Sequence, residues 1–315
     1  MKAVRAAPGS VALIELDDLE EPPGVGELLA IKSASICASD LMYIRFGSRF
    51  VLGHEIAGLR EDGTPVIVEA LYGCMQCNEC RRGDYNLCAT HGERALGMFA
   101  DGGMAERFRA PSARLVPVPE GLDVRDASLV EPASVSWHAL RLARVGRGKR
   151  VAVVGAGALG LLAAAGALRQ GGEDVAIEAR HGHQREAALR IGARIDPKGV
   201  YDIVVEAAGT PASLARSIEL AAPGGTVVVL GVHIGKVELD WMPLFHKEGR
   251  LIPSLGYCRH EHGREMEDAA AMLAEDPEIA RALITHRFPI EDAVEAFRVA
   301  ADRASGAIRV VIEPT

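Results

Sequence analysis

The sequence predicts an α/β protein that combines a parallel sheet with a separate β-rich domain. From about Ser134 onward, helices rich in alanine and leucine alternate with apolar strands, and this alternation is typical of a parallel sheet. Before about Pro119 the segments are short and rich in valine and isoleucine, and the turn sequences EPPG, EDGTP and ADGG separate them. That pattern indicates an irregular β-rich domain.

Composition and charge narrow the class of protein. The chain has 315 residues, of which 49% are hydrophobic and 25% charged, so it can form two domains that each have a core. The formal net charge of −8 provides no global positive field for nucleic acid or an anionic membrane. We therefore expect a small-molecule partner, held by a local site, and neither nucleic acid nor a membrane.

The apolar segments do not indicate targeting or membrane insertion. The start MKAVRAAPGS lacks an apolar stretch with a cleavage site, and four glycines interrupt the apolar run at 151–168. We read that run as a strand, a turn and a helix. The expected compartment is the reducing cytoplasm, where clustered cysteines bind metal more often than they form disulfides.

Four strands are expected in the parallel sheet, one at each apolar run between helices. Their sequences are RVAVVG, VAIEA, YDIVVEAAG and GGTVVVLGV. After them, residues 265–284 read as helix and AIRVVIEP as a strand that could rejoin the first domain. The sequence shows no internal repeat.

Four cysteines fall within the fifteen residues CMQCNECRRGDYNLC: Cys74, Cys77, Cys80 and Cys88. This spacing suits one tetrahedral zinc ion, and four thiolates would leave no position for substrate, so the predicted role is structural. Two reduced CxxC pairs are an alternative. A zinc ribbon that binds nucleic acid is another, although such modules usually pair two separate knuckles.

A glycine motif, GxGxxG, follows the first predicted strand at Gly155, Gly157 and Gly160, and includes Ala158 and Leu159. In this position the glycines let the backbone approach a pyrophosphate at the positive end of the next helix. The motif is weak alone, but its place between strand and helix favours a dinucleotide site. A glycine turn that serves packing only is the alternative.

Two short patterns supply further ligand types: Cys37-Ala38-Ser39-Asp40 and Gly53-His54-Glu55. A cysteine, a histidine and a carboxylate from different segments are the ligands of a catalytic zinc with an open position. Together with CMQCNECRRGDYNLC, DGGMAERF, VEPAS, GAGALG, VVEAAGT and PGGTVVVLGV, in this order, the chain resembles the zinc-dependent medium-chain dehydrogenases/reductases along nearly its whole length. This superfamily includes alcohol, sorbitol, threonine and glucose dehydrogenases.

The resemblance implies a fold and an assembly. A catalytic domain built on a chaperonin-10-like β-barrel would comprise residues 1–134 and 270–315 and carry the structural zinc lobe. A Rossmann domain with a doubly wound parallel sheet would comprise residues 135–269, and a cleft between the domains would hold nicotinamide and metal. Relatives form homodimers and homotetramers, usually by joining their Rossmann sheets edge to edge.

The resemblance also implies roles at the catalytic metal. Cys37 and His54 match zinc ligands, and Glu131 of VEPAS matches the third ligand of the polyol and sugar dehydrogenases. Glu55 matches a residue that exchanges onto the metal or approaches it through water, with support of a ligand as its alternative role. Zinc would polarise the substrate oxygen while hydride passes to the nicotinamide. Ser39 would pass the substrate proton outward, with Asp40 orienting the metal site.

Two departures from the family pattern affect the substrate side. Met42 stands where many alcohol dehydrogenases have a histidine that ends the proton relay, and methionine cannot transfer a proton. The proton would instead leave through the coenzyme ribose and water, or through Tyr43. Only sixteen residues separate Cys37 from His54, so we expect a reshaped substrate pocket in a compact variant.

The third departure concerns coenzyme choice. The acidic residue that binds the NAD ribose is expected nineteen positions after Gly160, which is Ala179 here. Arg180 follows, and the same loop includes His181, His183 and Arg185, so we favour NADP, whose 2′-phosphate an arginine can bind. If Glu178 were the ribose acceptor instead, the coenzyme would be NAD. The loop ARHGHQR could also be merely solvated.

Several further residues are expected near the coenzyme. Ala207 and Ala208 would line the adenosine side, and Leu230, Gly231 and Val232 would meet the nicotinamide through backbone groups. Core packing at strand ends is the alternative for these positions. The solitary Cys258 is expected to be a buried apolar residue.

Two classes of function remain open. The first is a zinc-dependent oxidoreductase that transfers hydride between NADP(H) and a secondary alcohol, polyol or sugar, or the corresponding carbonyl. The second is a protein that binds zinc and dinucleotide as a redox sensor or scaffold without turnover. A zinc-free reductase of the quinone type lies between them, but such proteins generally lack the ligand set found here.

Overall fold

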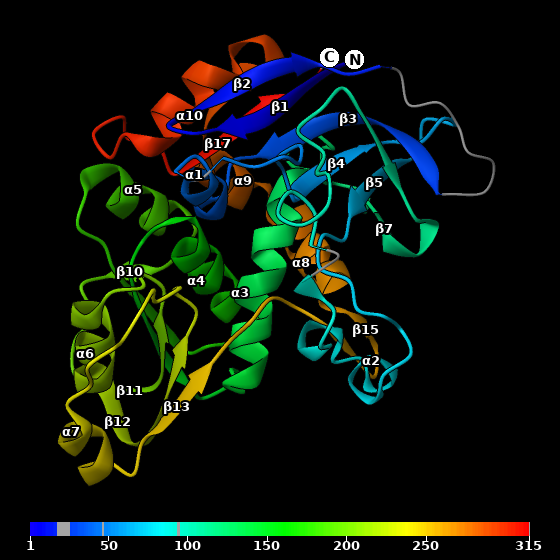
Figure 1. Ribbon diagram of the computed structural model, residues 1–315. Coiled ribbons are helices and arrows are strands. Elements are labelled where there is room, and N and C mark those ends of the chain that lie inside the picture. The colour runs from blue at the N-terminus through cyan, green and yellow to red at the C-terminus, as the bar shows by residue number, and fades with distance from the viewer. Residues whose placement is uncertain (18–25, 46, 93–94, 315) are drawn as a thin grey trace. The chain divides into compact units, whose positions relative to one another are not determined.

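The computed structural model describes residues 1–17, 26–45, 47–92 and 95–314, so the EPPG turn lies outside the described residues. The chain divides into two compact units (Figure 1). Unit 1 comprises Met1–Glu131, Cys258–Ala280 and Ile284–Thr315, and unit 2 comprises Pro132–Tyr257 and Arg281–Leu283.

Unit 1 is built on a sheet to which seven of the described strands belong, with the main order β16-β17-β3-β4-β5-β7 and β6 paired to β3. The strands are β3 (Glu27–Ser35), β4 (Glu55–Leu59), β5 (Pro65–Val68), β6 (Arg107–Ala110), β7 (Leu115–Pro117), β16 (Ile284–Pro289) and β17 (Arg309–Glu313). Because β17 pairs antiparallel with β3, the C-terminal segment shares a sheet with the first part of the chain.

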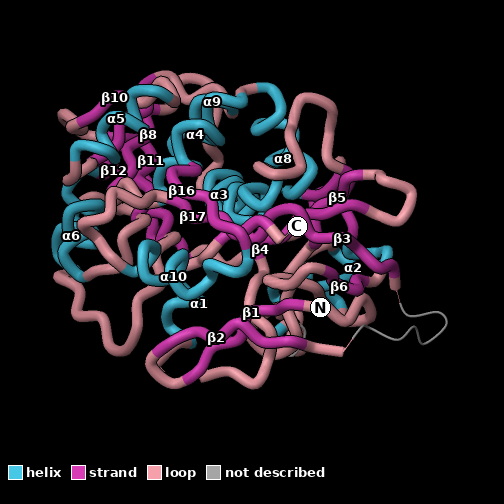
Figure 2. The backbone as a smooth tube through the Cα atoms, turned by 90° about the horizontal axis from the view of Figure 1, so that it is seen from above, coloured by secondary structure: helices cyan, strands magenta, loops and turns pink. Residues whose placement is uncertain are grey.

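A hairpin and a helix cover part of this sheet. Strands β1 (Lys2–Ala7) and β2 (Ser10–Glu15) pair antiparallel, and α10 (Ala293–Ala301) packs against β2, β16 and β17 (Figure 2). Alternate residues of β3, Leu29 and Ile31, are buried with Phe297 of α10 in one apolar core. The alternation of buried and less buried residues expected for a half-buried strand therefore determines which face of β3 packs on the core. Cys37 lies two residues after the end of this strand.

The remaining elements of unit 1 are short, or belong to its second segment, Cys258–Ala280. They are α1 (Ala38–Tyr43), α2 (Asn78–Arg82), η1 (Tyr85–Leu87), η3 (Ser112–Arg114), η4 (Ala127–Leu129), β14 (Arg259–His260), β15 (Gly263–Arg264), α8 (Glu265–Glu275) and η5 (Ile290–Asp292). Helix α3 (Val130–Leu142) begins in unit 1 and continues in unit 2, and α9 (Pro277–Leu283) also includes residues of both.

Unit 2 contains the predicted parallel sheet. Six of the described strands pair in the order β10-β9-β8-β11-β12-β13, and every pairing is parallel. They are β8 (Arg150–Val154), β9 (Asp174–Glu178), β10 (Arg194–Ile195), β11 (Tyr201–Glu206), β12 (Ala221–Val229) and β13 (Arg250–Pro253). This order is that of a dinucleotide-binding Rossmann sheet, so the predicted fold class is confirmed.

Helices follow the strands of unit 2 as the alternating sequence pattern predicts. They are α4 (Ala158–Arg169), α5 (Gly182–Arg190), α6 (Pro211–Leu220) and α7 (Trp241–His246). Helix α6 begins with Pro211 behind a capping box, in which Thr210 accepts a hydrogen bond from the Ser213 N–H. Within the described parts of the chain, no helix combines the length and apolar character needed to cross a bilayer.

The sheet also locates a ligand site. The strand order reverses between β8 and β11, since β8 is followed in sequence by β9 on one side and lies beside β11 on the other. In sheets of this kind, ligands bind beyond the carboxyl ends of the strands at that reversal. The turns after β8, β9, β11 and β12 are therefore the candidate coenzyme contacts of unit 2.

Candidate active site and metal centres

The first candidate centre lies where β3 ends and α1 begins. Cys37 is the N-cap of α1, and its backbone N–H donates to the Asp40 carboxylate over 2.9 Å. Asp40 has no exposed surface. A buried carboxylate that caps its own helix start fixes the direction of this turn, and with it the Cys37 side chain.

His54 lies directly before β4 and faces α1. Its Nδ1 atom is 3.6 Å from Asp40 Oδ1, and its Nε2 atom is 3.5 Å from Ser39 Oγ. The possible ligand atoms of Cys37, His54 and Glu55 all lie within 4.8 Å of one another. The structure thus brings together three residues that the sequence predicted as metal ligands.

The donor set fits a zinc ion. Tetrahedral zinc with thiolate and imidazole ligands keeps its donor atoms about 3.5 Å apart, and the donor atoms of Cys37, His54 and Glu55 lie no more than 4.8 Å from one another. His54 Nδ1 is buried and makes no hydrogen bond, and the buried Asp40 Oδ1 lies 3.6 Å from it. A buried imidazole nitrogen of this kind needs a partner, and a metal ion beside it would supply one.

The titratable groups of this centre affect one another's pKa. Burial lowers the pKa of His54, but the negative charges of Asp40 and Cys37 outweigh burial and raise it well above its ordinary value. Burial also raises the pKa of Asp40 and of Glu55, against the opposing effect of His54. A region that holds one histidine among several acidic groups attracts a cation.

Glu131, the second residue of α3, is the other predicted carboxylate ligand. It is buried, and burial raises its pKa to about 7, while the charge of His54 opposes the rise and Glu55 adds to it. Glu131 is outside the group of donor atoms that lie within 4.8 Å, which contains Glu55 instead. Its role as third ligand therefore stays a prediction.

Sequence reasoning missed Arg309 on β17. Its side chain is 5% exposed, and Nη1 donates to Glu55 Oε1 over 3.0 Å and to the Ile36 carbonyl over 2.8 Å. Arg309 thus gives Glu55 a fixed counter-charge beside Cys37 and His54. The only sequence signal was an arginine within the apolar run AIRVVIEP, which on its own indicates a strand.

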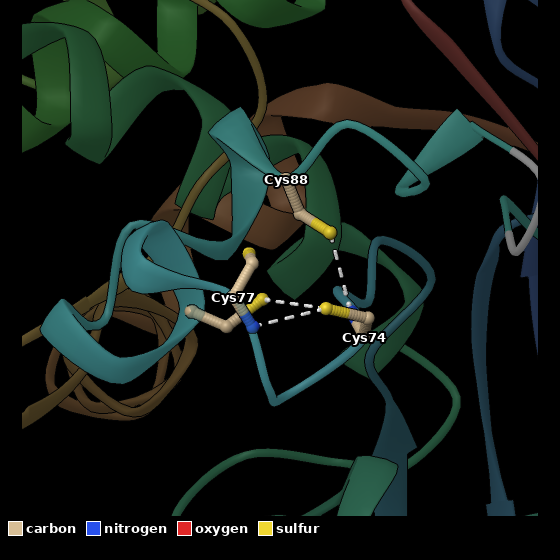
Figure 3. Close-up of side chains that lie close together, drawn as sticks. Cys74, Cys77 and Cys88 are labelled. Carbon is tan, nitrogen blue, oxygen red and sulfur yellow. Dashed lines mark hydrogen bonds between the residues drawn. The ribbon is translucent and has the colours of Figure 1, made fainter.

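The second candidate centre is the cysteine cluster around α2. The sulfur atoms of Cys74, Cys77, Cys80 and Cys88 lie within 4.8 Å of one another, and all four cysteines are reduced. Figure 3 shows the sulfurs of Cys74, Cys77 and Cys88 turned toward one another. The Gln76 and Cys77 N–H groups point at Cys74 Sγ over 3.4 and 3.3 Å, and the Cys74 N–H at Cys88 Sγ over 3.3 Å.

These backbone contacts favour thiolates. The N–H groups of Gln76 and Cys77 lower the pKa of Cys74, and the N–H of Cys74 lowers the pKa of Cys88 to about 6. Burial and the thiols of Cys80 and Cys74 raise the pKa of Cys77 to about 12 despite the Cys80 N–H. Four thiols this close cannot all ionise without a cation, and a closed tetrathiolate zinc site resolves that conflict.

The turn after β8 has the form that a dinucleotide requires. Gly155 has φ +108°, and a Cβ on Gly160 would lie 1.8 Å from the Gly155 carbonyl, so both glycines are needed by the backbone itself. A Cβ on Gly157, in contrast, would meet nothing within 4 Å, and no side chain caps the start of α4. Free N–H groups at an open helix start fit a pyrophosphate.

The loop after β9 contains the residues that were predicted to contact the adenosine ribose of the coenzyme. Ala179 is buried, whereas Arg180 is exposed. The side chain of Glu178 accepts a hydrogen bond from Arg216 Nε of α6 over 3.0 Å. Glu178, the alternative ribose acceptor, is therefore already bound by a cation.

The other predicted residues of this loop are distributed around the start of α5. His181 is its N-cap, and the His181 ring stacks on His183 with 5.6 Å between centroids. Arg185 forms a two-point ion pair with Asp196 at 2.7 and 2.8 Å. Arg185 therefore has a carboxylate partner, and a contact from Arg185 to a 2′-phosphate would compete with it.

Two further loops follow β11 and β12. Ala207 is half-buried after β11, and Leu230 is 4% exposed after β12, while Val232 is 81% exposed. The N–H groups of Leu230 and Gly231 both donate to the Glu206 carbonyl, over 2.8 and 3.0 Å. These predicted coenzyme residues thus lie on adjacent loops of one sheet edge. Cys258 is 1% exposed, which confirms its expected burial.

Fold and centres together define a metal-dependent dehydrogenase that uses a dinucleotide. Residues 26–120 match the alcohol dehydrogenase GroES-like domain, and residues 124–313 match the glucose dehydrogenase C-terminus. The chain belongs to the zinc-containing medium-chain dehydrogenase/reductase family, as its motifs predicted, and its β domain is the GroES-like, or chaperonin-10-like, domain.

Individual relatives agree with this assignment. The chain is 29% identical to L-galactonate-5-dehydrogenase of Escherichia coli, with 87% of this chain and 88% of that protein covered. It is 30% identical to sorbitol dehydrogenase 2 of Saccharomyces cerevisiae, with 85% of each covered. Galactitol-1-phosphate dehydrogenase from Escherichia coli has a TM-score of 0.89 and 26% identity over 100% of both chains.

A structure described as a zinc-binding dehydrogenase from Sinorhizobium meliloti 1021, solved with NADP bound, has a TM-score of 0.87 and 26% identity over 99% of both chains. The chain is therefore an oxidoreductase that acts on CH–OH groups, in the zinc-dependent alcohol and polyol dehydrogenase family.

Proposed function

We propose that the protein catalyses reversible hydride transfer between NADP(H) and a secondary alcohol of a polyol or sugar, or the corresponding carbonyl, with zinc at Cys37 and His54. The observation that carries this proposal is the convergence of a thiol, an imidazole and a carboxylate within 4.8 Å. A set of three protein ligands leaves one position for a substrate oxygen, which the tetrathiolate cluster does not.

The carboxylates of the centre divide into two roles in this proposal. Glu131 is the third zinc ligand, and Glu55 is an exchanging or supporting group. Arg309 balances the charge of Glu55, so a thiolate from Cys37 and the carboxylate of Glu131 would together balance one divalent ion. This charge count supports Glu131 as the permanent ligand.

The chain's own groups would handle the substrate proton. Zinc, when bound, would act as a Lewis acid on the substrate oxygen, and the coenzyme would accept the hydride. Ser39 would take the proton of the substrate hydroxyl, and the distance of 3.5 Å between its Oγ and His54 Nε2 supports this role. Met42 cannot pass it on, so the proton would continue through coenzyme ribose and water, or through Tyr43.

Two arguments support polyols and sugars as substrates. A carboxylate in the ligand set is the feature that the polyol and sugar dehydrogenases of the family share. The relatives also carry names such as sorbitol dehydrogenase, D-xylulose reductase and L-galactonate-5-dehydrogenase. The short segment between Cys37 and His54 means that no single relative's substrate can be transferred to this chain.

Three observations support NADP over NAD. Ala179 replaces the expected acidic residue, and the exposed guanidinium of Arg180 follows it. Glu178, on which NAD preference would depend, is held by Arg216. An arginine next to a small residue favours a 2′-phosphate because no carboxylate repels that group there.

The proposed assembly is a homodimer or homotetramer. Strand β13 lies at one edge of the parallel sheet, and the exposed large apolar residues of nearby segments include Ile234, Trp241, Phe245 and Leu255. An open edge strand with exposed apolar neighbours favours association with another copy. Light scattering after size exclusion would test this assembly, and a monomer at micromolar concentration would contradict it.

The test of function is a screen of polyols, sugars, secondary alcohols and their ketones with NADP(H) and NAD(H), on protein whose zinc is quantified. We expect two zinc ions per chain and turnover with NADPH as the preferred reductant. If both coenzymes bind but no substrate is turned over by the zinc-loaded protein, the redox-sensor alternative replaces the proposal.

A further inference from the structure

One buried carboxylate joins the two loops that follow β11 and β12. Glu206, the last residue of β11, has no exposed surface. Its Oε1 atom accepts hydrogen bonds from the N–H groups of Ala208 and Gly209, over 2.9 and 2.8 Å, and from Ser213 Oγ over 2.6 Å. Its Oε2 atom lies 3.1 Å from Nε2 of His233, beyond the end of β12.

The donor in this pair is assigned from the chemistry of the two groups. A carboxylate oxygen accepts hydrogen bonds, so we assign His233 the tautomer in which Nε2–H donates to Glu206 Oε2. The His233 side chain is 11% exposed, and the contact joins residues 27 positions apart. Glu206 therefore receives donors from its own loop on one oxygen and from the next loop on the other.

The two loops also meet backbone to backbone. A Cβ on Gly231 would lie 2.3 Å from the Gly209 nitrogen and 2.7 Å from Glu206 Oε2, and a Cβ on Gly209 would lie 2.7 Å from the Val232 carbonyl oxygen. Distances this short leave no room for any side chain. The path of residues 230–233 thus depends on glycine at both positions and on the His233 contact that follows them.

These loops lie at the carboxyl ends of adjacent parallel strands, at the edge where the dinucleotide is expected. In the proposed function, residues 230–232 meet the nicotinamide, and the loop after β11 meets the adenosine half. His233 is the residue directly after 230–232, the segment that would meet the nicotinamide. A side chain that fixes the end of such a segment controls the direction of its backbone N–H and C=O groups.

We propose that His233 and Glu206 form a brace that positions residues 230–232 for the nicotinamide half of the coenzyme. The brace rests on the proposed coenzyme function and makes His233 a positioning residue. His233 acts through the backbone of Gly231 and Val232, and its loss leaves the adenosine half of the site intact. Ser213 bonds the other Glu206 oxygen from α6, so it supports the adenosine side.

The test compares ligands with and without nicotinamide on the full chain. NADPH and 2′-phospho-ADP-ribose, which lacks the nicotinamide ring, are titrated into wild-type protein and into His233→Ala, His233→Gln and Ser213→Ala variants. His233→Ala should weaken the binding of NADPH about 10-fold and the binding of the fragment less than about 2-fold. The reason is that the lost hydrogen bond to Glu206 supports only the loop that would meet the nicotinamide, which the fragment lacks. His233→Gln, which keeps an N–H donor, should recover most of the NADPH affinity.

The control and the contrary outcomes separate the brace from general damage. Ser213→Ala should weaken both ligands by similar factors. Equal weakening of both ligands by His233→Ala, or no weakening, would overturn the brace while leaving the coenzyme function in place. Wild-type protein that binds neither ligand would overturn the proposed function and the brace together. If His233→Ala does not fold, His233→Leu, which also lacks an N–H donor, takes its place beside His233→Gln, and the brace is wrong if His233→Leu weakens the binding of both ligands equally or of neither.

Discussion

Arg309 of β17 and Glu55 of β4 form a buried ion pair, with Nη1 of the arginine 3.0 and 2.9 Å from the two carboxylate oxygens. The side chains are 5% and 1% exposed. Glu55 directly follows His54, so the pair fixes a negative charge and its counter-charge next to two predicted zinc ligands. Strand β17 therefore supplies part of the metal centre as well as a strand of the sheet.

Replacing Arg309 by methionine should leave Glu55 buried without its partner. Breaking a buried pair in this way costs about 3–5 kcal/mol in the free energy of unfolding. Urea denaturation of the zinc-loaded protein measures this loss. In Arg309→Met/Glu55→Gln no unpaired charge remains, so this double variant should regain more than half of the lost stability. An additive double variant would show that the pair does not act as a unit.

The Cys37→Ser variant should lose turnover but keep coenzyme affinity. Removing the thiolate removes one of three ligands from the catalytic ion, so we expect about one zinc per chain in place of two and a decrease in kcat of at least about 1000-fold. Metal analysis and NADPH titration test the two halves separately. Cys258→Ala, which changes a buried cysteine outside both predicted zinc sites, should keep both metal ions. Retained turnover in Cys37→Ser would contradict the mechanism.

Arg180→Ala should weaken NADPH much more than NADH. A charge-assisted contact to the 2′-phosphate exists only with NADPH, so its loss should cost about 10–100-fold in affinity for that coenzyme and less than about 3-fold for NADH. Fluorescence titration gives both constants without a substrate. Arg147→Ala, an exposed arginine before β8, is the control and should change neither value. Equal losses for both coenzymes would reject the phosphate contact.

Arg216→Leu tests whether the charge of Glu178 must be balanced. Without the 3.0 Å contact, the Glu178 carboxylate would repel the additional negative charge of NADPH. Because the pair is partly exposed, the expected effect is small, about 3-fold weaker NADPH binding with NADH unchanged. The double variant Arg216→Leu/Glu178→Gln should restore the wild-type ratio. An unchanged ratio in the single variant would show that Glu178 lies too far from the phosphate.

The sequence predicts those parts of the site that depend on local chain geometry. The turn at Gly155 and Gly160 requires glycine for the backbone itself, and four closely spaced cysteines need only one short segment to converge. Contacts between distant segments have no such signal. Arg309 and Glu55 are 254 positions apart, and their pairing follows from the antiparallel registers of β17 against β3 and of β3 against β4, which no local pattern specifies.

Histidine assignments show the same limit. His54 was identified because GHE belongs to a family motif, whereas no motif distinguishes His233 from the remaining histidines. Its partner Glu206 is 27 positions away, and the sheet brings the two together because β11 and β12 are parallel neighbours. The pairing of strands thus determines which isolated polar residues meet, and this information is spread over the whole domain.

The Tyr85→Phe variant should destabilise the protein more as the pH rises. Burial raises the pKa of Glu69 above its ordinary value, and the hydrogen bond from the Tyr85 hydroxyl, with Arg264, opposes that rise. A carboxyl with a raised folded-state pKa stabilises the fold below its unfolded-state pKa, and this contribution is lost as the pH rises through the folded-state value. Without the Tyr85 donor the pKa of Glu69 is higher still.

The stability difference between wild type and Tyr85→Phe should therefore be small near pH 5 and grow to about 1–3 kcal/mol near pH 8, because the ionised Glu69 loses a buried donor. Urea midpoints of the zinc-loaded proteins across this range measure it. Tyr201→Phe is a matched control, since the buried Tyr201 hydroxyl accepts a hydrogen bond from the Lys198 N–H and makes none with a carboxylate of the described residues. Its stability loss should not vary with pH. A Tyr85→Phe loss that is constant or larger in acid would show that Glu69 does not depend on Tyr85 for its charge.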